Sequence, residues 1–109
     1  MGFLNWLKQG FSYHGKAVAL YRSGMAKANE RNYAGAIADY SSALRQPHIQ
    51  TDVKAMVLYN RSIAYSAIHE EAKSAEDLRI VLEMPGLPPQ IRTQAKQRQE
   101  RIRRRTDRV

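Results

Sequence analysis

The clearest hydrophobic pattern in the chain lies between residues 33 and 44. Its apolar positions recur at the spacing of one face of an α-helix: Tyr33, Ala36, Ile37, Tyr40, Ala43 and Leu44. The stretch before it carries a second stripe of this kind: Ala17, Leu20, Tyr21, Gly24 and Ala28. The polar pair Arg31-Asn32 separates the stripes, and Asn32 suits a helix N-cap. Together these features predict a helical hairpin over residues 17–44.

Gly24 falls in the middle of the first predicted helix. Glycine there costs about 1 kcal/mol relative to alanine. The position is tolerable if a neighbouring helix crosses at this point and occupies the space of the missing side chain.

The hairpin matches a later stretch of the chain when the sequence is displaced so that Lys16 falls on Lys54. We call this displacement the repeat shift. Nine pairs of positions between 16 and 47 are then identical: Lys16/Lys54, Ala17/Ala55, Leu20/Leu58, Tyr21/Tyr59, Ala26/Ala64, Ala34/Ala72, Asp39/Asp77, Leu44/Leu82 and Pro47/Pro85. Internal repetition with a period of roughly 20 to 50 residues is typical of stacked structural repeats.

Both copies also fit a longer pattern. In the first copy it falls on Leu20, Ser23, Gly24, Lys27, Ala36 and Tyr40; in the second, on Leu58, Arg61, Ser62, Tyr65, Ser74 and Leu78. Over residues 16–85 the chain therefore resembles the tetratricopeptide repeat (TPR) family, whose repeats read Trp-x2-Leu-Gly-x2-Tyr, Ala-x3-Phe and Pro. The resemblance implies antiparallel helix pairs, a right-handed superhelix, a concave binding face and no catalysis.

We therefore expect one all-α domain over residues 1–109, a TPR-like α-α superhelix of two hairpins with a capping helix at each end. Its parts are an amphipathic helix (1–15), two repeats (16–47 and 52–85) and a basic helix (88–105). Two repeats fall short of the three or so that a stable stack needs, so the flanking helices serve as caps. Thr51 or Asp52 is expected to cap the helix that opens the second repeat.

The N-terminal helix is predicted from one apolar face: Phe3, Leu4, Leu7 and Phe11. Three roles remain open for it. It covers the first hairpin, lies on a membrane surface with Trp6, or docks on a partner or a second copy of the chain in a homo-oligomer.

Charge is concentrated at the C-terminus. The net charge is +8, of which residues 90–109 carry eight Lys/Arg and two acids, a net of +6. The arginines of this tail, Arg101, Arg103, Arg104 and Arg105, are candidates for binding phosphates or an acidic protein face. The alternative is a solvated helix end whose cations offset the C-terminal dipole.

The sequence offers little for catalysis. There is no cysteine. The three histidines, His14, His48 and His69, have no His or Cys partner at i+3 or i+4, which argues against zinc. No nucleophile, base and oxyanion site assemble, so we expect no enzyme and no cofactor. No apolar run reaches the roughly 18 residues of a membrane span. A cytoplasmic location, or one peripheral to a membrane, is expected.

In the TPR family the first helix of each hairpin lines the binding groove. By that resemblance the groove residues are Val18, Tyr21, Met25 and Asn29 from the first copy, and Met56, Tyr59, Asn60, Ile63 and Ala67 from the second. The resemblance implies a partner protein that inserts a peptide or a helix. Three states stay open: an open groove, a groove covered by the terminal helix, and ordinary core.

Two further functional hypotheses remain from the sequence. The stretch Tyr59–Ser62 resembles co-chaperone members of the family, in which such an Asn holds a partner's C-terminal carboxylate. The first-repeat Lys and Asn of that subgroup are Tyr21 and Met25 here, so we do not expect the clamp. The alternative function is an anionic-surface binder, for membrane or nucleic acid, acting through the arginine tail and the N-terminal helix.

Overall fold

The structure, a computed structural model, describes residues 15–108. It contains five helices in this range: α2 (Gly15–Asn29), α3 (Tyr33–Leu44), α4 (Thr51–Ala67), α5 (Glu71–Glu83) and α6 (Pro89–Asp107). The described residues include no β-strand, so the all-α prediction is confirmed for them. The predicted N-terminal helix lies outside the described residues, apart from residue 15.

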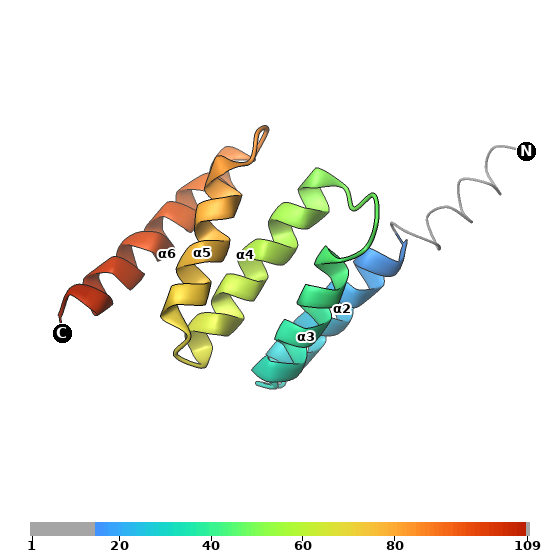
Figure 1. Ribbon diagram of the computed structural model, residues 1–109, viewed down its shortest axis with the longest axis horizontal. Coiled ribbons are helices and arrows are strands. Elements are labelled where there is room, and N and C mark those ends of the chain that lie inside the picture. Colours follow the sequence, from blue (N-terminus) through green and yellow to red (C-terminus); the bar gives the residue numbers. More distant parts are fainter. Residues whose placement is uncertain (1–14, 109) are drawn as a thin grey trace, which may run out of the picture.

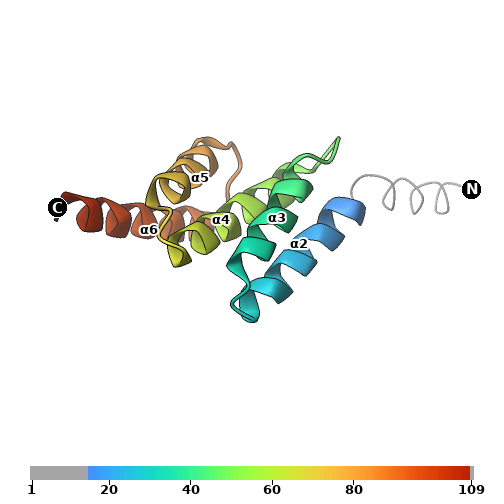
Figure 2. The same ribbon diagram turned by 60° about the horizontal axis from the view of Figure 1, so that its bottom comes forward.

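The helices form two hairpins and a fifth helix that stacks on them. α2 packs mainly against α3, and α4 mainly against α5. The hairpins join through α3 against α4, and α6 packs on α5. Figure 2 shows α3 and α5 on one side of the molecule and α2, α4 and α6 on the other, and Figure 1 shows the order along the chain. The helical hairpin predicted from residues 17–44 is confirmed.

Each hairpin turns in the same way. Arg31 (φ 63°) and His69 (φ 63°) are left-handed residues related by the repeat shift, and each follows the end of a first helix. The next amides, those of Asn32 and Glu70, donate to the carbonyl oxygens of Lys27 and Tyr65, at 2.8 and 2.9 Å. This is the Schellman arrangement, which satisfies carbonyls left free at a helix end.

The loops that follow each hairpin match as well. His48 (φ 59°) and Gly86 (φ 71°) are also related by the repeat shift and also adopt the left-handed conformation. Every positive-φ residue among the described ones therefore belongs to a pair that the sequence repeat relates. The repeat is thus present in the backbone conformation.

Side-chain contacts repeat with the same shift. Ser23 Oγ donates to Asp39 Oδ2 at 2.6 Å, and Lys27 Nζ lies 3.0 Å from the same carboxylate oxygen. In the second hairpin Arg61 makes a two-pronged contact with Asp77, with both nitrogen–oxygen distances 2.8 Å. Positions 23 and 39 correspond to positions 61 and 77. In each copy an aspartate of the second helix is held by a side chain of the first helix.

Gly24 lies where α3 crosses α2, as its position in the sequence required. A Cβ atom added to Gly24 would lie 2.5 Å from the ring of Tyr40, a side chain that is itself 1% exposed. The second hairpin has Ser62 and Leu78 at the corresponding positions, and both are fully buried. The two hairpins therefore fill the same crossing with different pairs of residues. The first pairs Gly24 with the large ring of Tyr40, and the second pairs the small Ser62 with the smaller apolar Leu78.

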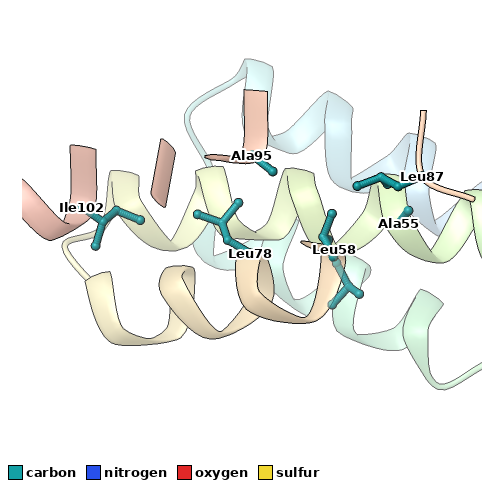
Figure 3. Close-up of a cluster of buried hydrophobic side chains, with 7 residues drawn as sticks. Ala55, Leu58, Leu78, Leu87, Ala95 and Ile102 are labelled. Atoms are coloured by element: carbon teal, nitrogen blue, oxygen red, sulfur yellow. The ribbon is translucent and has the colours of Figure 1, made fainter. Parts of the chain in front are cut away.

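α6 stacks on α5 as α4 stacks on α3. Val57 and Ala64 of α4 lie in the apolar cluster shared with α3, and Ala95 and Ile102, which the repeat shift relates to them, lie in the cluster shared with α5. Figure 3 shows the second cluster, with Ile102 at one end and Ala55 beside Leu87 at the other. α6 thus packs on the second hairpin in the way that α4, the first helix of that hairpin, packs on the first hairpin. It ends at Asp107, slightly beyond the predicted end at position 105.

The helix caps were predicted with mixed success. Asn32 is the N-cap of α3, and its side chain accepts a hydrogen bond from the Gly35 amide at 3.0 Å, as predicted. The predicted cap of α4 was wrong. Gln50 takes that position without a side-chain bond, because helix begins already at Thr51. Asp52 accepts instead from the neighbouring Val53 amide.

Gly24→Ala should destabilise the protein although alanine is the better helix former. The new methyl group meets the buried Tyr40 ring, and overpacking of this kind costs about 1–3 kcal/mol. The double variant Gly24→Ala/Tyr40→Leu resembles the Ser62/Leu78 pair of the second hairpin in side-chain size. It should recover part of the free energy of unfolding that Gly24→Ala loses. Urea unfolding of wild type, both single variants and the double variant measures this. A more stable Gly24→Ala protein would contradict the crossing.

Tyr40 should make the fold sensitive to alkaline pH. Burial raises the pKa of its hydroxyl from 10.0 to about 12. The folded state then holds the proton more tightly than the unfolded state, so this stability is complete below about pH 10 and is lost as the pH rises towards 12. In Tyr40→Phe the corresponding decline in the free energy of unfolding should be smaller. An unchanged decline over that pH range would show that other groups cause it.

Candidate functional site

The first helices of the hairpins, α2 and α4, lie on the same side of the molecule as α6 (Figure 2), and we call the side that they share the α2–α4–α6 face. Its members on α2 and α4 are the residues predicted for the groove, and each is exposed or half-buried. On α6 the repeat shift relates Met56, Asn60, Ile63 and Ala67 to Gln94, Arg98, Arg101 and Arg105. The structure therefore places the predicted residues on a surface. We call the residues that α2, α4 and α6 contribute to it the first, second and third rows, and the third row is basic.

Tyr21 links the first two rows of this face. Asn60 Nδ2 donates to the Tyr21 hydroxyl at 3.1 Å and to the Met56 carbonyl oxygen at 2.8 Å. The Tyr21 ring lies 6.1 Å from that of Tyr40, between centroids. Burial raises the pKa of the Tyr21 hydroxyl, and the Asn60 bond offsets part of that effect. Tyr21 is thus half core and half surface, and its hydroxyl is engaged within the chain.

Tyr59 makes the corresponding link between the second and third rows. The guanidinium carbon of Arg98 lies 6.0 Å from the centroid of the Tyr59 ring, at the limit of a cation–π contact. Positions 21 and 60 correspond to positions 59 and 98. The same type of contact, between a tyrosine of one helix and a polar side chain of the next, therefore occurs twice across the face.

Between the tyrosines lie half-buried apolar side chains. Met25 and Tyr21 pack on the cluster of the first hairpin, and Tyr59 packs on the cluster of the second. Ile63 is half-buried and belongs to neither cluster, so its exposed part can contact a ligand. Asn29 and Ala67, at the ends of α2 and α4, are exposed.

The arginines of the C-terminal tail differ in whether they form ion pairs with carboxylates of the same chain. Arg103 contacts Glu100 and Asp107, at 2.5 and 3.1 Å, and Arg104 lies 3.3 Å from Glu100. Arg105 reaches Glu71 of α5 at 3.4 Å. These pairs are exposed and contribute little to stability, but they place carboxylates where an external anion would have to bind.

Arg98 and Arg101 lack such partners. Within the stretch 15–108, no carboxylate lies within ion-pair distance of either guanidinium. Both lie on the α2–α4–α6 face, Arg98 half-buried against Tyr59 and Arg101 exposed. Of the four tail arginines proposed from the sequence, Arg101 is therefore the one positioned on the predicted groove without a carboxylate partner.

An apolar pocket opens at the end of this face where α4 and α6 begin. It has a volume of about 380 Å³. Its lining comes from the first turns of both helices and from the loop before α6: Thr51, Asp52, Ala55, Met56, Met84, Pro85, Gly86, Leu87, Pro88 and Ile91. Met56 is shared between this pocket and the predicted groove. The pocket is large enough for one bulky apolar side chain.

Several of these features were missed from the sequence. Arg98 was counted only as tail charge, because its role depends on α6 lying beside α4. The pocket is formed by a loop that the sequence marked merely as a helix break. The repeat shift was the available signal: continued by one more step, it places positions 94, 98 and 101 on the face.

The described residues include no cluster of metal-ligating side chains and no membrane-spanning helix. They contain no group of three His, Cys, Asp or Glu side chains that could hold a metal ion. None of the helices that the structure describes combines the length and the apolar character needed to cross a bilayer. His48 and His69 lie at left-handed turn positions, and His14 lies outside the described range.

No protein-family model, characterised protein or solved structure matches the chain.

The Tyr21–Asn60 contact should be a measurable structural link between the hairpins. Tyr21→Phe and Asn60→Ala remove its two partners, and a net hydrogen bond of this kind is worth about 0.5–1.5 kcal/mol. A double-mutant cycle on the free energy of unfolding should give a coupling of that size. Additive effects would mean that the contact contributes nothing to holding α2 against α4.

Proposed function

We propose that the protein is a TPR-like interaction scaffold that binds a peptide or helix of another protein on the α2–α4–α6 face. The observation that supports the proposal is the recurrence of turn conformations and helix-crossing contacts in the two hairpins, with α6 packed on α5 as α4 is packed on α3. Repeats of this kind form extended surfaces for binding other chains. The proposed location is the cytoplasm.

The chemistry of the face supports protein binding. It combines half-buried methionine, isoleucine and tyrosine side chains with an amide and with two arginines that have no carboxylate partner among the described residues. Tyrosine and arginine are enriched among the residues that dominate binding energy at interfaces, and methionine adapts to different partners. An apolar strip with few polar anchors suits the docking of a short segment.

The ion pairs that the tail arginines form with carboxylates of the same chain favour peptide binding over the anionic-surface alternative. Three of the four arginines proposed to bind anions contact carboxylates of the same chain. An anion would have to compete with these contacts. We therefore propose the face, and not the tail, as the main binding surface.

A displayed library of random short peptides tests the proposal. Wild-type protein should enrich peptides that also bind in solution, and Ala67→Asp should weaken their binding about tenfold or more, because it places an unpaired charge in the interface. Ala38→Asp is the matched control. It introduces the same change at an exposed position of α3, on the other side of the molecule, and should leave affinity unchanged.

Far-UV circular dichroism should show equal helix content in the wild type and both variants. If the enriched peptides bind Ala67→Asp as well as wild type, the proposed face is wrong. If the library yields no peptide that binds in solution, peptide binding itself is unsupported.

A further inference from the structure

The pocket and the two arginines without carboxylate partners lie on the same face, a few helical turns apart. We infer that the partner segment is an acidic peptide with one bulky apolar residue, which enters the pocket between α4 and α6 while its carboxylates contact Arg98 and Arg101. This inference rests on the proposed function, because it specifies what the same face recognises.

The apolar end of the site is defined by the pocket. Met56, Met84 and Ile91 contribute flexible or branched apolar surface, and about 380 Å³ is near the lower limit of ligand pockets. That volume suits one side chain better than a whole ligand. Asp52, the charged residue of the lining, would repel an acidic residue placed directly at the pocket. The carboxylates of the segment must therefore lie further along the face.

The charged end is defined by Arg98 and Arg101. Neither guanidinium has a carboxylate partner within the described part of the chain, whereas each of the next three arginines along α6 has one. The guanidinium carbon of Arg98 also lies 6.0 Å from the centroid of the Tyr59 ring, which places it on the face beside Tyr59. Charge complementarity therefore selects an acidic segment.

The helix geometry sets the spacing between the two ends. Ile91 precedes Arg98 by seven positions and Arg101 by ten on α6, which corresponds to about 10 and 15 Å of helix rise. An extended peptide covers these distances in about three to five residues. The segment should therefore carry its acidic residues about three to five positions from the apolar one.

The test uses the full-length chain and a displayed library of random short peptides. Enriched peptides should share one bulky apolar residue and acids at that spacing. Because exposed charge pairs contribute about 0.2–1 kcal/mol each, Arg98→Gln with Arg101→Gln should weaken binding of a selected peptide about two- to thirtyfold. The same affinity should fall with added salt. Met56→Ala should weaken it independently.

Lys96→Gln is the matched control. Lys96 is an exposed residue on the opposite side of α6, and its loss changes the net charge by the same single unit as either arginine substitution. Affinity should stay at the wild-type value. An equal loss in Lys96→Gln would mean that overall charge, and not the arginine pair, attracts the peptide, which overturns the inference.

The remaining outcomes separate the two proposals. Enriched peptides that lack acids, or that bind the arginine variants normally while Ala67→Asp abolishes binding, overturn this inference and support the proposed function. A library without any binder contradicts both. The bound peptide can also be competed with unlabelled protein or with anionic vesicles at equal concentration. Displacement of the peptide by either competitor would assign the face to that competitor and overturn the acidic-segment inference.

Discussion

The fold depends on how closely the two helices of a hairpin can approach each other. In the first hairpin the absence of a side chain at Gly24 lets the Tyr40 ring lie directly on the α2 backbone. In the second hairpin the small buried residue Ser62 stands at the position of Gly24. Ser74 Oγ donates to the Ser62 carbonyl oxygen at 2.7 Å across the same crossing. Close crossing brings the aspartates of α3 and α5 within reach of their partners on α2 and α4, and so aligns the first helices that form the proposed binding face.

The α2–α4–α6 face is a consequence of that alignment. Because the hairpins repeat in sequence and in packing, a contact between neighbouring first helices occurs again one step later. Tyr21 meets Asn60, and Tyr59 meets Arg98. The amide of Asn60 at the first contact is replaced by the guanidinium of Arg98 at the second, so the contact between α4 and α6 carries a positive charge that the contact between α2 and α4 lacks.

The sequence was sufficient for those features that follow from local periodicity. The apolar stripe of residues 33–44, the Asn32 cap and the small residue at the helix crossing are each determined by neighbours close in the chain. The sequence was not sufficient for features that depend on packing between hairpins. Gln50 took the cap position expected for Thr51 or Asp52, since the helix already includes both of the stronger capping residues. Arg98 and the pocket near Met84 could be assigned only once α6 was placed beside α4.

The outer side of α6 has a consequence for assembly. Stacked repeats are open-ended, and identical exposed ends can join head to tail into filaments. At the positions where α4 carries the buried residues Ala55, Leu58 and Ser62, α6 carries Thr93, Lys96 and Glu100. The side chains of α6 at these sites are polar or charged, where those of α4 are small or apolar. A second copy of the chain stacked on these positions would have to cover polar and charged side chains, which disfavours head-to-tail joining there.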